Sequence, residues 1–360
     1  MKRFFIGILL LITLFFLNYA VEFDSCQILN SGSYELNESI LSSGSNCIEI
    51  TGNNIILDCQ GFNISGTGSN YGIYITGNNS QVLNCNINNF NRGIYFYSQN
   101  NYLYNSSVNG SIYGYYLGSN SHNQTLILNK ATSNVVAGIY LSFTSHNNTL
   151  FSNIINDSST GITINSDTNI IFENNISNSN TGISLSQGNS NNISSNIIQN
   201  NYNRGIHVSG SSANNNRFVS NIISENNQGI YLNAIEDNIF TSNTIISNIN
   251  ENIYFYSFSG GPYTNLFYNN TLGNISKISS SNWANWENQF NLSTQGNIYF
   301  NSSGLGSGII HCFSINNCDN YAEILYFPSL NQISEDVSSL FPFHTPFYLL
   351  SILFFYFLSN

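Results

Sequence analysis

Apolar and polar residues follow a short pattern that returns every 21 to 24 residues along most of the chain. Each copy reads glycine, apolar residue, variable residue, apolar residue, and a ninth copy has asparagine in place of the glycine. The nine copies begin at Gly72, Gly93, Gly114, Gly138, Gly161, Gly182, Gly205, Gly229 and Asn252. A fixed period of this length indicates a solenoid, in which each turn of the chain stacks on the one before it.

Each copy contains two segments that are expected to form strands. In the first segment the two apolar positions are separated by one residue, so both side chains are predicted to face the interior. The second segment reads apolar-x-x-Asn-x-apolar, and its polar column consists of Ser106, Asn129, Asn153, Asn174, Asn196, Asn221, Asn243 and Asn270. Stacked about 4.8 Å apart, these amides can hydrogen-bond along the column. Asparagine also tolerates left-handed backbone, which suits a corner.

The connectors between these segments are rich in Asn and Ser and contain no helical stretch. Because every copy presents its segments in the same order and direction, successive turns must pair in parallel. The sequence therefore predicts an all-β protein, a right-handed parallel β-helix solenoid of about nine to ten turns with N- and C-terminal caps. The expected boundaries are 1–20 for a signal peptide, 21–50 for the N-terminal cap, 51–280 for the β-helix, 281–340 for the C-terminal cap and 341–360 for a hydrophobic tail.

Both ends of the chain carry apolar segments. Lys2 and Arg3 precede an apolar run that extends to Leu17, and the small residue Ala20 follows. This arrangement is typical of a secretory signal peptide, and a retained signal anchor is the alternative. At the other end, residues 341–358 are apolar but are interrupted early by prolines and are shorter than the ~20 residues of a bilayer-spanning helix. A short membrane tail and a buried or partly disordered end both fit this segment.

Charge limits the partners of the protein. Charged residues make up only 7% of the chain, and the net charge is −11. Loss of Lys2 and Arg3 with the signal peptide leaves five basic residues (7 − 2) against eighteen acidic ones, a net charge of −13 (5 − 18). Nucleic acid is therefore excluded, because no basic surface can neutralise its phosphates. The expected location is secreted or at the cell surface, with membrane attachment if the C-terminal tail inserts.

Six cysteines in an exported chain are compatible with disulfides. The predicted pairs are Cys26–Cys47, which would close the N-terminal cap, and Cys312–Cys318, which would close a small loop after the repeats. Cys59 and Cys85 extend the polar column of the second segment upstream. Cysteines in register on adjacent turns have Cα atoms about 4.8 Å apart, within the range of a disulfide. A disulfide and two buried free thiols are both consistent with this placement.

The segment that leads into the repeats carries a more specific signal. It contains Cys47-Ile-Glu-Ile-Thr-Gly52, Asp58-Cys59-Gln-Gly61 and Ile64-Ser-Gly-Thr-Gly68. Residues 26 to 275 resemble the secreted β-helix repeat proteins of the pectate-lyase-like superfamily, in particular the NosD-like and carbohydrate-binding or sugar-hydrolase-type repeat proteins. The resemblance implies an exported, often surface-associated protein, sometimes linked to copper delivery. This chain departs from copper binding, because it has one methionine and no cluster of His, Cys and Met, and no cofactor is predicted.

The resemblance also raises the question of catalysis, since polysaccharide-cleaving members use clustered carboxylates with basic residues near the substrate. Hydrolysis needs two carboxyl groups roughly 5–9.5 Å apart. Asp167 and Glu173 are the candidate pair, because they could approach each other across a corner. Arg92 and Arg204 precede repeat glycines five turns apart and form no basic groove. The sequence favours a non-catalytic protein; if it is an enzyme, it is expected to cleave polysaccharides.

Two connector histidines and several glycosylation sequons complete the candidate chemistry. His122 and His146 occupy equivalent Ser-His-Asn positions on successive turns. Two stacked imidazoles could bind Zn²⁺ or Cu²⁺, but a third ligand is missing, so a solvated corner pair is favoured and no metal site is predicted. The sequons at Asn123 and Asn147 lie in connectors, where glycosylation is sterically compatible with the fold.

Between the two inward columns of the first segment lies an outward column in which tyrosine dominates. It consists of Tyr74, Tyr95, Tyr116, Tyr140, Thr163, Ser184, His207, Tyr231 and Tyr254, with Tyr97 and Tyr256 at the next outward position. The first four tyrosines are predicted to stand about 4.8 Å apart on one flat face. Rings with hydroxyl tips suit a sugar chain, and the uncharged surroundings favour a neutral glycan. Packing alone is the alternative, because stacked tyrosines stabilise exposed strands.

The sequence therefore predicts an exported, non-catalytic surface protein that binds a glycan or a cell-envelope component. The expected ligand-binding residues are Tyr74, Tyr95, Tyr97, Tyr116 and Tyr140. A polysaccharide lyase or glycoside hydrolase with an unrecognised site is the alternative.

Overall fold

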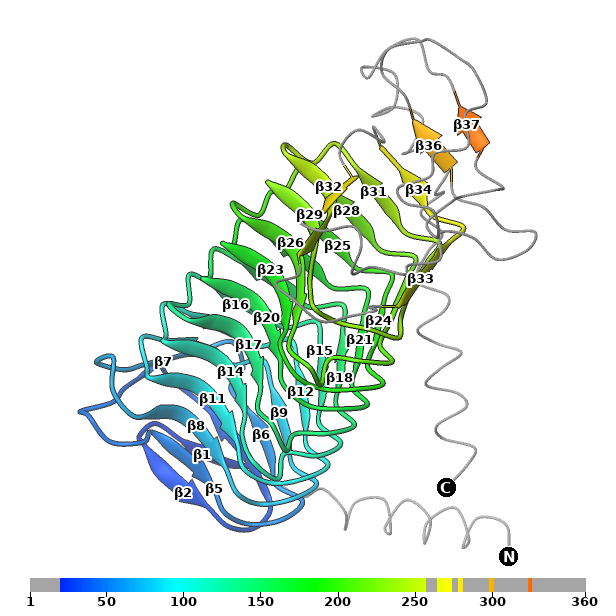
Figure 1. Cartoon of the computed structure of the whole chain (residues 1–360). Helices are drawn as coiled ribbons and strands as arrows, with labels where there is room; N and C mark the ends of the chain where they lie inside the picture. Colours follow the sequence, from blue (N-terminus) through cyan, green and yellow to red (C-terminus); the bar gives the residue numbers. More distant parts are fainter. Residues whose placement is uncertain (1–19, 257–263, 274–277, 281–297, 301–322, 326–360) are drawn as a thin grey trace, which may run out of the picture.

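The computed structural model describes residues 20–256, 264–273, 278–280, 298–300 and 323–325. Each turn contributes one short strand to each of three parallel sheets, and the turns stack into a right-handed solenoid of about ten turns (Figure 1). The predicted fold is confirmed. The described residues form no helix, and therefore none that is long and apolar enough to cross a membrane. The predicted signal peptide, the Cys312–Cys318 pair and the hydrophobic tail lie outside the described residues.

Three sheets, here named A, B and C, form the walls of the solenoid. Sheet A contains β1 (Val21–Phe23), β3 (Ser33–Leu36), β6 (Ile56–Asp58), β9 (Gln81–Leu83), β12 (Tyr102–Tyr104), β15 (Thr125–Ile127), β18 (Thr149–Phe151), β21 (Ile170–Phe172), β24 (Asn192–Ser194), β27 (Arg217–Val219), β30 (Asn238–Thr241) and β33 (Asn265–Tyr268). Sheet B contains β2 (Gln27–Leu29), β5 (Ile48–Ile50), β8 (Tyr71–Ile75), β11 (Arg92–Phe96), β14 (Tyr113–Leu117), β17 (Ala137–Leu141), β20 (Thr160–Ile164), β23 (Thr181–Leu185), β26 (Arg204–Ser209), β29 (Gln228–Asn233), β32 (Glu251–Tyr256) and β35 (Ile278–Ser280). Sheet C contains β4 (Ile40–Leu41), β7 (Asn63–Ser65), β10 (Asn86–Asn88), β13 (Ser107–Asn109), β16 (Lys130–Thr132), β19 (Ile154–Asn156), β22 (Asn175–Ser177), β25 (Ile197–Gln199), β28 (Ile222–Ser224), β31 (Thr244–Ile246), β34 (Thr271–Leu272), β36 (Ile298–Phe300) and β37 (Glu323–Leu325).

The second segment of each repeat is two strands rather than one. In the copy that starts at Leu150, the first apolar residue belongs to β18, Asn153 lies at the corner, and Ile155 belongs to β19. The sequence pattern merges the two strands because the corner between them is only two residues long. Each turn therefore has three strands and three corners, and its cross-section is triangular rather than a two-layer sandwich (Figure 1).

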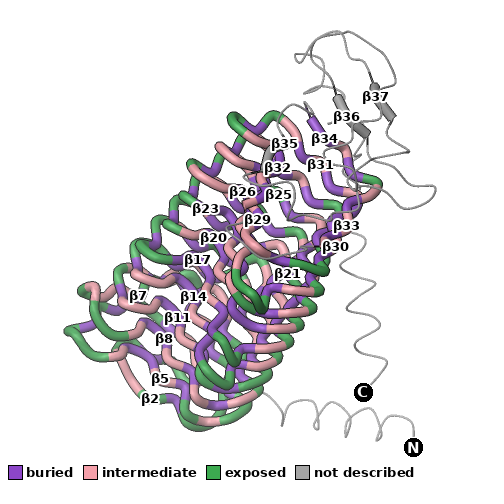
Figure 2. The backbone as a smooth tube through the Cα atoms, in the orientation of Figure 1, coloured by how far each residue is buried: buried purple, intermediate pink, exposed green. Residues whose placement is uncertain are grey.

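The interior is filled by the apolar columns that the repeat predicts. Both inward positions of the first segment are fully buried from Ile73 and Ile75 to Ile253 and Phe255, with a relative exposure of 0% at every position. Corresponding columns from sheets A and C close the core, which runs without interruption along the solenoid axis (Figure 2). Because burial of apolar surface is the main favourable term in folding, each turn is stable only when its neighbours cover its open edges.

The predicted asparagine ladder is present at the corner between sheets A and C. The Asn196 side chain accepts hydrogen bonds from the backbone N–H and the amide of Asn174, at 2.9 and 3.0 Å. Its own amide donates to Asn221 Oδ1 and to the buried carbonyl of Ile171. The left-handed residue at this corner is not the ladder asparagine but the residue before it, such as Ser195 with a φ of 55°. The expectation that the ladder residue itself adopts left-handed backbone is therefore wrong.

Ladders of the same kind line the two other corners, which the sequence analysis did not identify. Before sheet A the rungs are Asn101, Gln124, Asn148, Asn169, Asn191, Asn216, Asn238 and Asn265. After sheet C they are Ser158, Ser179, Asn201, Asn226 and Asn248. Their amides satisfy buried backbone groups that the sheet hydrogen bonds leave unpaired at each corner. The high asparagine content is therefore structural at all three corners.

The repeat glycines are required by space and not by backbone conformation. A Cβ on Gly182 would lie 2.6 Å from the carbonyl oxygen of Gly205 and 2.7 Å from the Ile198 side chain. None of the eight repeat glycines has a positive φ. In the ninth copy, the side chain of Asn252 accepts a hydrogen bond from Asn248 at 3.0 Å and so extends the corner ladder.

Two disulfides fasten the first turns. Cys26 and Cys47, the predicted pair, are bonded and join the residue before β2 to the residue before β5. Cys59 and Cys85 are also bonded, with Cα atoms 4.8 Å apart, which settles the alternatives that the sequence left open. Residues 21–50 supply the first strands of all three sheets. The boundaries expected for the two caps remain predictions.

We expect Asn196→Ala to lower the free energy of unfolding by about 2–4 kcal/mol, because it leaves the Asn174 N–H and the Ile171 carbonyl buried without partners. The control is Asn180→Ala at an exposed position, for which a change within about 0.5 kcal/mol is expected. Urea denaturation followed by circular dichroism measures both. Equal midpoints for the two variants would show that the ladder adds nothing to stability.

Candidate functional site

The outward face of sheet B carries the predicted tyrosine column. We name Tyr74, Tyr95, Tyr116 and Tyr140 the tyrosine stripe; they lie on β8, β11, β14 and β17 in direct register. All four are half-buried, and their neighbours along the strand face the core. Tyr97, at the next outward position, is 43% exposed and its ring centroid lies 6.1 Å from that of Tyr95. The sheet register therefore brings all five predicted ligand-binding residues onto one surface.

The rings of the tyrosine stripe do not form one flat stack. Tyr74 stacks on Tyr95 at a centroid distance of 5.0 Å, and Tyr116 stacks on Tyr140 at 4.9 Å. Between these pairs, Tyr95 meets Tyr116 edge to face, at 5.3 Å and an interplanar angle of 84°. The predicted flat face is therefore wrong: the surface consists of two stacked pairs turned against each other.

A second row of tyrosines, missed by the sequence analysis, supports the stripe from one side. The Tyr71 centroid lies 5.3 Å from Tyr74 and 5.0 Å from Tyr95. Tyr113 occupies the same place two turns later, 5.1 Å from Tyr116. Both residues directly precede a repeat glycine, and alternation along the strand would have placed them on the inner side. The signal in the sequence was the recurrence of tyrosine at this position.

Arg92 lies at the centre of this aromatic surface, between Tyr71 and Tyr113 in the register. Its guanidinium carbon is 4.1 Å from the Tyr116 centroid and 4.5 Å from that of Tyr95, within cation–π range. Nη1 donates to the Tyr71 hydroxyl at 3.0 Å, whereas the buried Nε has no hydrogen-bond partner among the described residues. No carboxylate of the described chain forms an ion pair with Arg92.

Burial raises the pKa values of Tyr74, Tyr95 and Tyr140 on this surface. It raises the pKa of Tyr95 to about 12, although the nearby Arg92 cation opposes the shift. The pKa values of Tyr74 and Tyr140 are also raised, mainly by burial. Each hydroxyl of these residues therefore remains a hydrogen-bond donor as well as an acceptor at neutral pH.

A smaller cluster of the same kind lies farther along sheet B. The Arg204 guanidinium carbon is 3.6 Å from the Tyr231 centroid, and Nη1 is 3.3 Å from His207 Nδ1. Burial and the Arg204 charge lower the pKa of His207 to about 4, so its ring is neutral at physiological pH. Between the two clusters, the outward column holds only the short side chains of Thr163 and Ser184. Both arginines thus lie over tyrosine rings, a role that the sequence analysis did not assign to them.

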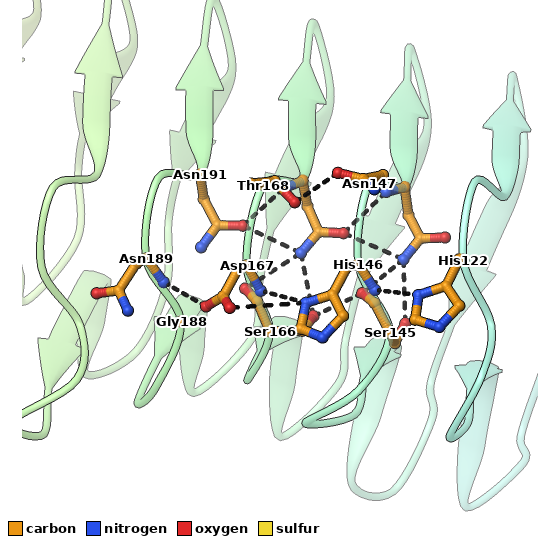
Figure 3. A network of polar contacts seen from close by, with 12 residues as sticks. His122, Ser145, His146, Asn147, Ser166, Asp167, Thr168, Gly188, Asn189 and Asn191 are labelled. Atoms are coloured by element: carbon orange, nitrogen blue, oxygen red, sulfur yellow. Dashed lines mark hydrogen bonds and ion pairs between the residues drawn. The ribbon is translucent and has the colours of Figure 1, made fainter.

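His122 and His146 are partly exposed corner residues and also rungs of a further hydrogen-bonded column (Figure 3). His122 Nδ1 accepts the backbone N–H of His146 at 3.3 Å, and His146 Nδ1 accepts that of Asp167 at 3.1 Å. An accepting nitrogen carries no proton, so each Nδ1 is unavailable to a metal while the column is intact. The two rings stack at a centroid distance of 5.5 Å, and the described residues supply no group of three or more ligands that would include them.

The structure does not bring the candidate carboxylates Asp167 and Glu173 together. Asp167 lies at the corner before β21, where Oδ1 accepts the backbone N–H of Asn189 at 2.7 Å (Figure 3). Glu173 lies at the corner after β21 and accepts from the Ser152 hydroxyl. Strand β21 and the residue on either side of it, Asn169 to Glu173, span about 13 Å at about 3.3 Å per residue. This exceeds the separation that hydrolysis requires, so the pair is withdrawn.

A different carboxylate pair appears at the N-terminal end of sheet A. Glu35 of β3 and Asp58 of β6 are paired in the register, and Glu22 of β1 precedes them in the same column. Adjacent rungs are about 4.8 Å apart. These early strands lie outside the regular repeat, so the sequence pattern does not reveal that the carboxylates are neighbours. Asp58 Oδ1 also accepts from the amide of Asn84 at 3.0 Å.

Comparisons with known proteins agree with this architecture. A family model described as "Periplasmic copper-binding protein (NosD)" matches residues 46–224. The Dettilon tailspike protein (gp208) is 18% identical with a TM-score of 0.57, covering 73% of this chain and 61% of that one. A mutant tailspike of E. coli bacteriophage HK620 in complex with a pentasaccharide is 11% identical with a TM-score of 0.53, covering 76% and 60%. The periplasmic alginate epimerase AlgG is 16% identical with a TM-score of 0.49, covering 82% and 77%.

These identities are low, so the likeness concerns the fold alone. The chain spans about 60% of the length of each tailspike, as the coverage values of 61% and 60% show. No curated protein sequence matches the chain.

The described residues do not fit a copper centre, although the matching family description names copper. No group of three or more His, Cys, Asp and Glu is close enough to hold a metal within the described ranges. The four described cysteines are consumed in disulfides, so they supply no thiolate. The stacked histidines use Nδ1 for backbone hydrogen bonds. Copper prefers thiolate, thioether and imidazole ligands, and of these the described residues bring together only the two stacked imidazoles.

We predict that His207 makes the protein less stable in acid. Unfolded His207 takes up a proton near pH 6.5, whereas the folded residue does so only near pH 4. Between these values the unfolded state binds more protons, so the free energy of unfolding decreases as the pH is lowered, by up to about 1.4 kcal/mol per pH unit. His207→Ser, which copies the neighbouring Ser184, should lack this component. Urea titrations of both proteins from pH 7.5 to 4 test this, and parallel curves would contradict it.

Proposed function

Because this chain belongs to the right-handed parallel β-helix proteins, we propose that it is an exported, non-catalytic surface protein that binds a glycan through sheet B. The observation that supports this proposal is the tyrosine stripe with Arg92 at its centre. Export is supported by the two disulfides, which persist in oxidising compartments, and by the periplasmic family description. The signal peptide, glycosylation and membrane attachment remain proposals.

The chemistry of the stripe matches a sugar chain. Tyrosine rings offer apolar faces to the C–H faces of a pyranose, and their protonated hydroxyls can bond to the sugar hydroxyl rim. The four tyrosines span three turn-to-turn steps, roughly 15 Å, which is enough for several consecutive sugar units. The rings are held by one another and by Arg92, so little side-chain entropy is lost on binding.

Arg92 changes the expected ligand. The sequence interpretation of uncharged surroundings is wrong at the centre of the stripe, because the guanidinium lies against Tyr95 and Tyr116 without a carboxylate partner among the described residues. A guanidinium can donate to sugar hydroxyls and to carboxylates alike. We therefore extend the proposed ligand class from neutral glycans to glycans that also carry acidic sugars.

The fold is compatible with such a ligand, since a tailspike of similar fold has been solved with a bound pentasaccharide. Polysaccharide cleavage remains the alternative function. The observation that favours it is the adjacent position of Glu35 and Asp58 on sheet A, about one turn spacing apart. A depolymerisation assay with the wild type and with Glu35→Gln distinguishes this alternative, because a catalytic pair would lose its activity in the variant.

We expect the triple substitution Tyr95→Ser, Tyr116→Ser and Tyr140→Ser to abolish binding on a glycan array that contains neutral and acidic glycans. The circular-dichroism spectrum should remain unchanged, because these side chains lie outside the core. Loss of the ring contacts should lower stability by about 0.5–1.5 kcal/mol per contact.

The matched control is Tyr102→Ser with Tyr104→Ser, which removes a stacked tyrosine pair from the outer face of sheet A. This variant should bind as the wild type does. If the triple variant still binds, or if the wild type binds nothing on the array, the tyrosine stripe only stabilises the sheet and does not bind glycans.

A further inference from the structure

The outer face of sheet A carries an apolar strip that the proposed glycan site does not use. We define the strip as Leu83, Tyr104, Ile127, Phe151 and Phe172, which occupy one outward position on five successive turns. All five are half-buried, and the Phe151 and Phe172 rings stack at a centroid distance of 5.5 Å. The parallel outward column holds Gln81, Tyr102, Thr125, Thr149 and Ile170, so neither column carries a charge on these turns.

Apolar residues that the fold itself does not require extend the strip. Leu128 is 44% exposed and has a φ of 55°, a backbone conformation that is unfavourable for leucine. The same corner position holds Asn105 one turn earlier and Ser152 one turn later, both left-handed as well. Ile170 of sheet A is 44% exposed, and Ile154 of the adjoining sheet C is 47% exposed. Leu128, Ile154 and Ile170 therefore enlarge the apolar surface beside the strip.

We propose that the C-terminal apolar segment of the same chain, Phe347–Leu358, covers this strip. The segment contains twelve residues, none of them charged, and would leave its apolar side chains in water if it were free. Twelve residues are too few to span a bilayer as a helix, and an apolar stretch of that length is more typical of a packed segment. The strip is the complementary surface within the described residues.

The dimensions of the two partners agree. In helical form, twelve residues are about 18 Å long at 1.5 Å per residue. The strip spans four turn-to-turn steps from Leu83 to Phe172, about 19 Å at 4.8 Å per step. A segment laid along the solenoid axis therefore contacts all five turns without overhang.

The connecting chain is long enough to reach the strip. The last described strand, β37, ends at Leu325, which leaves 22 residues up to Phe347 (347 − 325). Extended, they reach about 70 Å. In sheet C, β37 lies two steps beyond β34, and in sheet A, β33 lies four steps beyond β21. Measured along the axis from β37, Phe172 at the near end of the strip is therefore about 29 Å away, and Leu83 at the far end about 48 Å. A tether of this length favours the segment of the same chain over a second copy by effective concentration.

Photo-crosslinking in cells that express the full chain tests the contact directly. With Phe151→p-benzoylphenylalanine we expect crosslinks to peptides from residues 347–358 of the same chain. The matched control, Thr163→p-benzoylphenylalanine on the outer face of sheet B, should give none. A mixture of isotopically heavy and light chains separates contacts within a chain from contacts between chains. Crosslinks to a second copy, to lipid, or to no part of 347–358 would each overturn the proposal.

Proteolysis of the purified full-length protein gives an independent test. Phe151→Ser with Phe172→Ser should increase the rate of cleavage within 347–358 at least tenfold, the factor that corresponds to about 1.4 kcal/mol of lost contact free energy. The control, Tyr95→Ser with Tyr116→Ser, removes two rings from sheet B and should leave the cleavage rate unchanged. Equal cleavage rates in all three proteins contradict docking of the segment.

Discussion

The hydrogen bond from each corner amide to the next turn is the interaction on which the rest of the structure depends. The chain bends sharply at three corners in every repeat of 21 to 24 residues, and each corner interrupts the backbone hydrogen bonds between strands in the buried interior. Asparagine resolves this, because one amide can accept the N–H of the previous rung and donate to the following rung and to a buried carbonyl, as Asn196 does. The corners are thereby locked in register, and the strands between them must stack in parallel.

This register determines what the outer faces can display. Apolar residues and the repeat glycines occupy the inward positions. A Cβ atom added to one of these glycines would collide with the next turn. Outward positions are free to vary, and a residue type that recurs there becomes a continuous column about 4.8 Å per step. Sheet B uses this freedom for tyrosines with Arg92 and Arg204, and sheet A for an apolar strip. Two faces of one rigid rod thus have different chemistry without any change in the fold.

The two faces also suggest different partners. Protonated tyrosine hydroxyls beside an arginine that has no carboxylate partner in the described chain suit a hydroxyl-rich ligand from solution. The strip from Leu83 to Phe172 lacks charge and suits an apolar segment. The family description names copper, yet the described cysteines form disulfides and the stacked histidines serve the corner hydrogen bonds. The described chain therefore shares the β-helix fold but does not gather a set of copper ligands.

The sequence by itself determined the fold, the buried columns and the A–C corner ladder, because a repeated local pattern in a solenoid maps directly onto a repeated position in space. It also placed the tyrosines on one face, since strand alternation and a constant period are sufficient for that. Only the tertiary structure decided how side chains on different turns meet. The edge-to-face break between Tyr95 and Tyr116, the position of Arg92 against both rings, and the disulfide between Cys59 and Cys85 depend on rotamers and on contacts across turns. Glu35 and Asp58 became neighbours only through pairing of strands outside the regular period. Asp167 and Glu173 are separated by strand β21, which the sequence pattern did not distinguish from the corner before it.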